Sequence, residues 1–326
     1  MTERDEIWHA SAHENIVKGM CWTNNSQLIT CASDKTIKLW DPYNTASNSE
    51  PVATWLGSTG FTSISHHRNK NAFAVASDVI SIYDLERPTA APEVIAWPNK
   101  ADTITSVAFN QVETSVIAST ASDRAVILYD VRTSSPVART VLTFACNAVS
   151  WNPMEAYNFA LASENHDIMI FDSRNMSRAL NVLKDHVAAV MDVQFSPTGQ
   201  ELVSASYDRT LRIWKRDQGH SREIYHTKRM QRLFSARWTP DSKYVLSGSD
   251  DGNVRLTTIT LFLYHKDANE LAHYRSESGG PTPRRRRARK RPSTARRSST
   301  TTRSFRGTAT CPRCAASSVI ATSLRW

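Results

Sequence analysis

Short apolar runs separated by turns rich in Pro, Gly and Asp recur along most of this chain. The clearest unit is residues 186–214, for which the pattern predicts strands over 190–195, 202–205 and 211–214. The turns between them read "SPTG" and "YDRT", in which Pro fixes φ and Gly supplies a positive φ. The strands carry apolar residues on both faces, which is typical of antiparallel sheets that stack on one another.

Aromatic residues end these runs at nearly equal spacing, at Trp40, Tyr83, Tyr129, Phe171 and Trp214, with Thr257 in the sixth position. The intervals are 43, 46, 42, 43 and 43 residues, and an Asp directly follows the first four aromatic residues. A period of about 40–45 residues that ends in Trp-Asp is typical of four-stranded propeller blades.

The repeat predicts an all-β WD-repeat propeller over residues 1–257, with six recognisable four-stranded blades, followed by a tail over 258–326. A closed propeller contains about 4–8 blades, so six are sufficient. Residues 5–10 precede the first repeat, and we expect them to supply the outer strand of the last blade.

Two repeats match the structural tetrad of WD-repeat proteins. The resemblance implies a buried chain of hydrogen bonds from Trp through Ser or Thr and His to Asp, formed by His186, Ser204, Asp208 and Trp214 and by His13, Thr30, Asp34 and Trp40. Elsewhere the tetrad is degraded, with Tyr129 or Phe171 in place of Trp and Asn165 in place of Asp.

A His, a Ser and an Asp also resemble a hydrolase triad. Because the trio recurs blade after blade, we interpret it as a brace and expect no enzyme.

The net charge of +9 does not describe the repeats. Residues 257–326 contain 15 Lys and Arg against 3 Asp and Glu, whereas residues 1–256 contain 25 against 28. The basic character therefore belongs to the tail, and it gives no argument for nucleic-acid binding by the propeller. Five scattered Cys favour a reducing compartment. No secretory signal and no apolar run of membrane-spanning length is apparent.

The tail contains the basic run "PRRRRARKRPSTARR" (283–297) and a lone Cys311-x-x-Cys314 pair. The run lacks apolar periodicity, so we expect disorder there. The cysteine pair is half of a zinc site, and His273 is too remote to complete it. The His pair in "HHRNKN" (66–71) is expected to be a solvated hairpin. The sequence therefore predicts no metal and no other cofactor.

The amino-acid sequence of several repeats closely resembles that of the suppressor-of-fibrillarin family of nucleolar WD-repeat proteins. The resemblance spans about residues 10–256, and the stretches that carry it are "WNPMEAY" (151–157), "DHVAAVMDVQFSPTGQELVSASYDRTLRIW" (185–214) and "SREIYHTKRMQR" (221–232). It implies a component of the small-subunit processome that acts in early ribosomal RNA processing. Animal members of the family are also described as substrate receptors of cullin-RING ubiquitin ligases.

The chain departs from this family at both ends. Members carry an N-terminal extension and a further repeat before the point where Met1 stands, so that seven blades are expected. They also continue differently after "DDGNVRL" (250–256). When residues 311–326 are translated back into codons and the reading frame is shifted by one base, the codons can encode a sequence very similar to the family's own C-terminal tail. We hypothesise that residues from about 257 derive from an unspliced intron or a frame error.

Two groups of exposed residues are candidate contacts. "YDVR" and "FDSR" match the motif that WD-repeat ligase receptors present to their adaptor, so the resemblance implies adaptor contacts at Asp130, Arg132, Asp172 and Arg174. The alternative is that these residues form an ordinary solvated turn.

The segment "YHTKRMQR" interleaves basic and aromatic residues, a combination that suits contact with RNA or with a processome protein. The candidate contact residues are Tyr225, His226, Lys228, Arg229 and Arg232. Here the alternative is a solvated loop.

We therefore expect a non-enzymatic scaffold of the nucleus and nucleolus. Its expected partners are processome proteins and pre-ribosomal RNA or small nucleolar ribonucleoproteins, with neither a membrane nor a small-molecule substrate. The alternative function is that of a cullin-RING substrate receptor, bound to its adaptor through Arg132 and Arg174.

Overall fold

The computed structural model describes residues 8–10, 12–43, 50–95, 102–258 and 319–321. The chain divides into one compact unit of residues 1–259 with 316–326 and a second unit of residues 260–315. The second unit lies outside the described residues, as do the basic run, Cys311, Cys314 and His273. The prediction of a disordered tail therefore stays a prediction.

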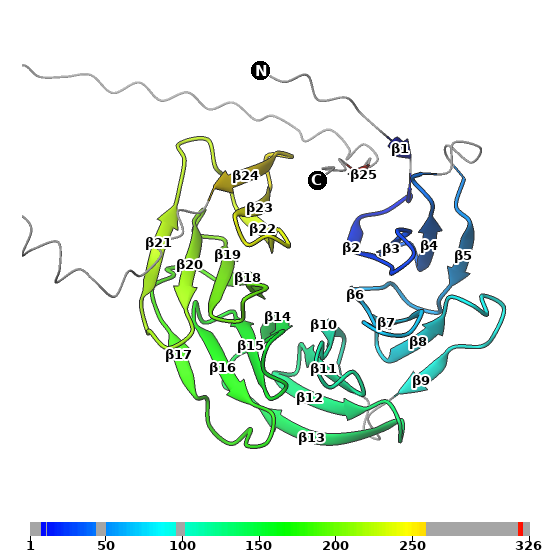
Figure 1. The fold of residues 1–326 in the computed structure, drawn as a ribbon, viewed down its shortest axis with the longest axis horizontal. Helices are drawn as coiled ribbons and strands as arrows, with labels where there is room; N and C mark the ends of the chain where they lie inside the picture. The colour runs from blue at the N-terminus through cyan, green and yellow to red at the C-terminus, as the bar shows by residue number, and fades with distance from the viewer. Residues whose placement is uncertain (1–7, 11, 44–49, 96–101, 259–318, 322–326) are drawn as a thin grey trace, which may run out of the picture. The chain divides into compact units, whose positions relative to one another are not determined.

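Six antiparallel sheets follow one another along the chain and around a common centre (Figure 1). Blade 1 comprises β2 (Val17–Trp22), β3 (Leu28–Ala32), β4 (Thr36–Trp40) and β5 (Ala53–Leu56). Blade 2 comprises β6 (Ser63–His66), β7 (Ala72–Ala76), β8 (Ile80–Asp84) and β9 (Glu93–Ile95). Blade 3 comprises β10 (Ile104–Phe109), β11 (Val116–Ala121), β12 (Ala125–Asp130) and β13 (Ser135–Val141).

The remaining blades repeat this order. Blade 4 comprises β14 (Cys146–Trp151), β15 (Asn158–Ser163), β16 (Ile168–Asp172) and β17 (Asn181–Leu183). Blade 5 comprises β18 (Val190–Phe195), β19 (Glu201–Ser206), β20 (Leu211–Lys215) and β21 (Ser221–Tyr225). Blade 6 has β22 (Leu233–Trp238), β23 (Tyr244–Ser249) and β24 (Val254–Thr258), and a separate pair is formed by β1 (Trp8–Ala10) and β25 (Val319–Ala321).

The predicted all-β, six-bladed propeller is confirmed, but the predicted ring closure is wrong. Residues 5–10 were expected to complete the last blade. Of these the structure describes residues 8–10, which form β1 and pair with β25, and blade 6 has three described strands. Trp8 and Ala10 pack instead with Leu28 and Trp40 of blade 1. Two large apolar rings, Trp8 and Trp40, lie 5.6 Å apart, and their burial favours this position.

The turn between the second and third strands has the same backbone conformation in five blades. One residue has a positive φ in each of blades 1, 3, 4, 5 and 6, namely Lys35, Arg124, His166, Arg209 and Gly252, with values of 65° to 72°. Glycine adopts this conformation without a steric penalty. In blade 5 the preceding Asp208 stabilises the turn, because its carboxylate accepts hydrogen bonds from the backbone N–H and the hydroxyl of Thr210.

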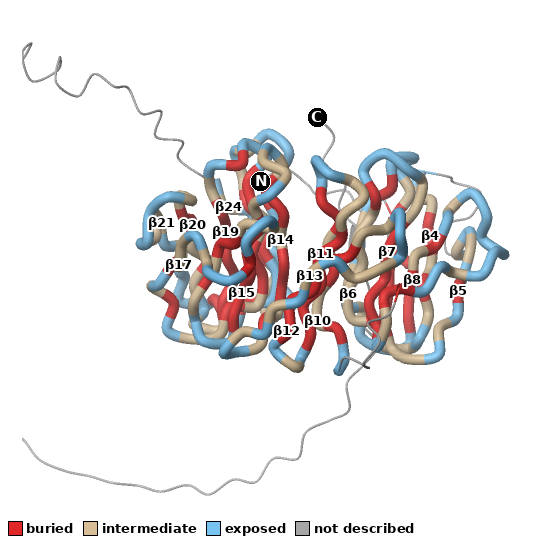
Figure 2. Tube along the Cα trace, turned by 90° about the horizontal axis from the view of Figure 1, so that it is seen from below, coloured by how far each residue is buried: buried red, intermediate tan, exposed pale blue. Residues whose placement is uncertain are grey.

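The core consists of the interfaces between neighbouring blades, so the middle strands are buried on both faces (Figure 2). In β19, Leu202 packs towards blade 4 while Val203 and Ala205 pack towards blade 6. This alternation explains the near-continuous apolar runs of the sequence, because each side of the strand faces another sheet. No helix occurs among the described residues, and within them nothing is long and apolar enough to cross a membrane as a helix.

Contacts between successive inner strands run from blade 1 to blade 6, and no contact of similar extent is recorded between β22 and β2. Gly19 lies against Ile64 of blade 2, so Met20 and Trp22 point away from it and are 56% and 46% exposed. On blade 6, Leu256 is 49% exposed on the face that points away from blade 5. The first and last blades therefore each have one apolar face that no described blade covers.

Candidate interaction surfaces

Blade 5 contains a continuous chain of buried hydrogen bonds. Trp214 Nε1–H donates to Ser204 Oγ at 2.8 Å, and Ser204 Oγ lies 2.7 Å from His186 Nε2. His186 Nδ1 lies 2.7 Å from Asp208 Oδ2. When His186 is neutral and protonated on Nδ1, every group in the chain donates to the next one, and no buried polar atom is left unsatisfied.

Burial and hydrogen bonding set the charges in this chain. Burial lowers the pKa of His186, which keeps the imidazole neutral near pH 7. Burial alone would raise the pKa of Asp208, but hydrogen bonds from His186 and Thr210 outweigh it and hold that pKa below its usual value. Asp208 is therefore ionised, and its carboxylate oxygens accept hydrogen bonds from His186 and Thr210.

Blade 1 repeats this arrangement with a threonine in place of the serine. Trp40 Nε1–H donates to Thr30 Oγ1 at 2.9 Å, and His13 lies 2.8 Å from Thr30 Oγ1 and 2.9 Å from Asp34. In both blades the residue that carries the hydroxyl is at most 1% exposed, and the hydroxyl already accepts the indole N–H. A substrate cannot reach such a hydroxyl, so the geometry is that of a brace between strands and not of a nucleophile.

The two Asp-x-Arg motifs occupy equivalent turns at the ends of β12 and β16. Arg132 lies 3.0 Å from the carboxylate of its own Asp130, and Arg174 lies 2.7 Å from that of its own Asp172. Both arginine side chains are exposed, and the Arg174 guanidinium also lies 4.3 Å from the centre of the Tyr157 ring. The motif thus presents exposed guanidinium groups that an internal carboxylate already neutralises.

We call Asp130, Arg132, Asp172 and Arg174 the paired-arginine surface. Its hydrogen bonds to arginine lower the pKa of both carboxyl groups, which therefore stay ionised well below pH 7. Backbone hydrogen bonds, such as that from Ser173 N–H to the carbonyl of Tyr157, tie these turns to the turns between the first two strands of each blade.

The connection from β21 to β22 lies at the opposite end of the strands, beside the turn that contains Asp208. Met230 is 4% exposed and packs in the cluster between blades 5 and 6, and it thereby anchors the connection. The predicted contact residues His226, Lys228, Arg229 and Arg232 are exposed around this anchor.

Tyr225 differs from the other four predicted residues. It is the last residue of β21, packs against the blade 5–6 cluster and donates its hydroxyl hydrogen to Glu223. Burial and this glutamate raise the pKa of Tyr225 to about 12. Its ring is held in the blade and does not join the exposed cations.

Sequence reasoning missed an aromatic pair beside these cations. Tyr207 and Phe234 lie 5.5 Å apart at 82°, an edge-to-face contact, and the Arg232 guanidinium lies 5.6 Å from the Tyr207 ring centre. Phe234 is 46% exposed. The pattern hid both rings, because Tyr207 stands in the "YDRT" turn and Phe234 within an apolar strand. The β-bulge between Leu233 and Ser235 moves Phe234 out of the buried register.

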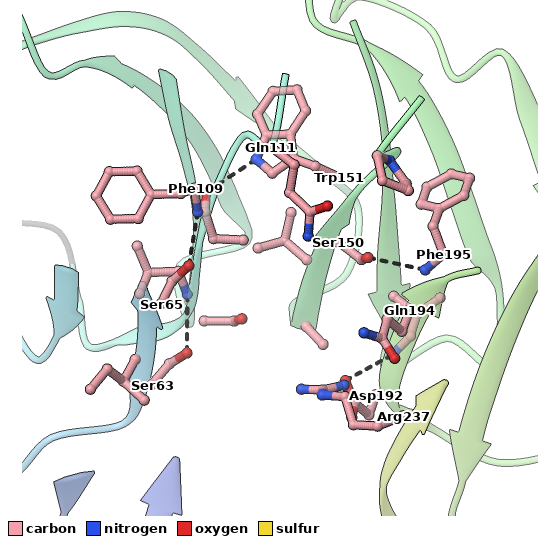
Figure 3. Close-up of a pocket in the computed structure, with 18 of the residues that line it drawn as sticks. Ser63, Ser65, Phe109, Gln111, Ser150, Trp151, Asp192, Gln194, Phe195 and Arg237 are labelled. Atoms are coloured by element: carbon pink, nitrogen blue, oxygen red, sulfur yellow. Dashed lines mark hydrogen bonds and ion pairs between the residues drawn. The ribbon is translucent and has the colours of Figure 1, made fainter. Parts of the chain in front are cut away.

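A cavity of about 470 Å³ lies between the inner strands of blades 2 to 6, as Figure 3 shows. Its serine hydroxyls are used between blades: Ser65 accepts from the backbone N–H of Phe109, and Ser150 from that of Phe195. Asp192 forms an ion pair with Arg237. These polar groups join neighbouring blades, so they do not form a free catalytic set.

Residues 66–71 form the predicted hairpin between β6 and β7, with Arg68, Asn69 and Lys70 exposed at its tip, but the two histidines are not solvated. His67 is 5% exposed, its Nδ1 accepts the backbone N–H groups of Asn69 and Lys70, and its ring packs on Phe109. The local sequence hides this, because only the neighbouring blade supplies Phe109. Among the described residues no cluster of His, Cys, Asp and Glu has a metal-binding arrangement.

The described cysteines, Cys21, Cys31 and Cys146, are free thiols. Burial raises the pKa of both Cys31 and Cys146 to about 12, so these two thiols are unreactive near neutral pH.

Comparison with known proteins agrees with this architecture. The model of the family "WD domain, G-beta repeat" matches residues 5–41, 177–215 and 218–257. With its six blades and buried Trp-Ser/Thr-His-Asp braces, the chain is a WD-repeat propeller protein.

The resemblance expected from the sequence is also confirmed. The chain is 45% identical to Protein SOF1 of Saccharomyces cerevisiae over 281 residues, covering 78% of this chain and 57% of that protein. It is 42% identical over 248 residues to DDB1- and CUL4-associated factor 13 of Danio rerio, covering 75% of this chain and 55% of the relative. For the Homo sapiens protein of that name the identity is 41% over 259 residues, with 78% and 58% covered. The chain thus spans little more than half the length of these relatives.

Proposed function

We propose that this protein is a non-enzymatic scaffold of the nucleolar small-subunit processome, required for early ribosomal RNA processing. The observation that carries the proposal is the 45% identity to SOF1 over 281 residues. The propeller supports it, because its catalytic-looking trios are buried braces and its exposed features suit binding. The exposed cations of residues 226–232 are the proposed contact to RNA or a processome protein.

The experiment is affinity capture of the tagged full chain from nucleolar extract, followed by sequencing of the bound RNA and mass spectrometry. The expected result is enrichment of small-subunit RNA precursors and their assembly factors. Recovery of neither, from a chain that purifies as a folded monomer, overturns the proposal. Nuclear and nucleolar localisation is checked in parallel by imaging the same tagged chain.

A second candidate function is substrate reception for a cullin-RING ubiquitin ligase. It is favoured by the relatives named DDB1- and CUL4-associated factor 13 and by the exposed Arg132 and Arg174. Replacing both arginines by Ala is expected to remove an adaptor from the captured proteins and to leave RNA precursors in place. Arg178→Ala is the matched control, since Arg178 is an exposed arginine on the same connection as Arg174.

A further inference from the structure

The end of the propeller at blades 5 and 6 combines the exposed Phe234 and the half-buried Tyr207 with cations that have no acidic partner among the described residues. Tyr207 and Phe234 make an edge-to-face pair, and Arg232 lies over the Tyr207 ring. The two rings come from different blades, so the fold and not the local sequence brings them together. A ring pair with one exposed member offers a face on which a planar base can stack.

The charges around the rings are positive. Lys228, Arg229 and Arg232 are exposed on the connection to β22, and the exposed Arg209 adjoins Tyr207 in the turn of blade 5. None of these four forms an ion pair among the described residues.

Most of the carboxylates near these cations are already bonded to other residues. Asp208 is bonded to His186, and Asp251 is paired with Arg255. Asp250 remains as one exposed carboxylate against the four cations. The surface therefore keeps a net positive charge next to the Tyr207–Phe234 pair.

We propose that Tyr207, Phe234 and Arg232 form a stacking platform for single-stranded RNA, with Lys228, Arg229 and Arg209 on its phosphates. The proposal rests on the proposed function and deepens it, because it moves base stacking from Tyr225 to a pair that two blades create. Rings beside a line of cations are the combination by which proteins bind single strands without sequence preference. A double helix presents no unstacked base, so it gains nothing from the rings.

The direct test is photocrosslinking of the full chain to a 12-nucleotide oligouridylate that contains 5-bromouridine, with peptide mapping by mass spectrometry. The expected crosslinks fall on Tyr207 or Phe234. Crosslinks confined to the basic run of residues 283–297 overturn the platform. This arm uses the unaltered chain, so it does not depend on whether a variant folds.

The quantitative test is fluorescence anisotropy with a labelled oligouridylate at high salt, which suppresses purely ionic binding by the basic run. Tyr207→Leu with Phe234→Leu keeps apolar bulk and removes both rings, and the affinity is expected to fall about tenfold. The matched control is Phe144→Ala, since Phe144 is 45% exposed and has no ring or cation contact recorded among the described residues. Equal affinity of the double variant and the parent chain overturns the proposal.

Two further outcomes separate this proposal from the proposed function. If the double variant loses processome association but keeps its oligouridylate affinity, the surface binds a protein and the RNA platform is wrong. If the unaltered chain captures no small-subunit precursor yet shows the tenfold ring dependence, the platform stands and the proposed function fails.

Discussion

The two ends of the propeller both expose arginine, but they differ in what those arginines have left to bind. On the paired-arginine surface, Arg132 and Arg174 are each bonded to an aspartate two residues earlier in the chain. At the other end, Lys228, Arg229 and Arg232 are paired with no carboxylate in the described part of the chain, and Arg232 lies beside the Tyr207 ring. An exposed arginine can therefore already be paired with a carboxylate of its own turn. The positive charge that remains available to a binding partner is then smaller.

The largest effect is expected from changing the exposed cations of the connection between β21 and β22. Charge reversal of Lys228, Arg229 and Arg232 to Glu is expected to reduce recovery of small-subunit RNA precursors at least 100-fold, on the order of the salt sensitivity of several phosphate contacts. The melting temperature should stay within about 2 °C, because exposed substitutions away from packed groups change stability little. Quantitative PCR of captured RNA and a thermal melt measure the two effects.

The control for this variant is Arg124→Glu, which reverses an exposed cation in the turn between the second and third strands of blade 3. RNA recovery should be unchanged there. Equal losses in both variants would show that total charge matters and that the two ends do not differ.

The second effect is on the brace beneath the free cations. Ser204→Ala removes the hydroxyl that joins Trp214 Nε1 to His186 Nε2 and leaves two buried polar atoms unsatisfied. The free energy of unfolding is expected to fall by about 2 kcal/mol. Denaturant titration measures it, with Ser177→Ala on an exposed turn as the control. An unchanged midpoint would mean that the chain of hydrogen bonds contributes nothing to stability.

The third effect tests the internal pairing directly. Asp130→Asn with Asp172→Asn keeps oxygen acceptors for the turns but frees both guanidinium groups, so adaptor binding should tighten several-fold if that surface binds an acidic partner. Arg132→Ala with Arg174→Ala should weaken it by about tenfold or less, since the internal pairs already compete for the arginines. Binding to the purified adaptor measures both changes. The same direction of change in both variants would contradict the pairing argument.

The smallest effect is that of pH on the brace. The pKa of His186 and that of His13 are lowered by burial, so the unfolded chain takes up protons that the folded chain excludes. Stability is then complete above the unfolded value of about 6.5 and declines as the pH falls below it. The lowered pKa of Asp208 adds a loss below about pH 4. Melting temperatures at pH 7.5 and 5.5 test this, and a higher value at pH 5.5 would contradict it.

The sequence predicted the blades because each one repeats a local pattern. The strands expected over 190–195 and 211–214 correspond to β18 and β20, and the turn with Gly199 has the expected positive φ. The tetrad residues could be proposed from the resemblance to WD-repeat proteins. The structure adds the register that brings them together, since Ser204 lies opposite Arg212, two residues before Trp214.

What the sequence could not predict depends on contacts between blades or on side-chain choices within a turn. The Tyr207–Phe234 pair joins two blades and depends on a β-bulge, and the burial of His67 depends on Phe109 of the next blade. The position of β1 likewise depends on packing against Trp40. The pairing of Arg132 and Arg174 with Asp130 and Asp172 depends on the conformation of each turn.

The most direct measurement is parallel capture of the full chain in three forms: unaltered, with Lys228, Arg229 and Arg232 reversed to Glu, and with Arg132 and Arg174 replaced by Ala. We predict that small-subunit RNA precursors dominate the unaltered capture, disappear with the first variant and persist with the second. A capture dominated by a cullin adaptor, insensitive to the first variant and lost with the second, would contradict the account and assign the protein to a ubiquitin ligase.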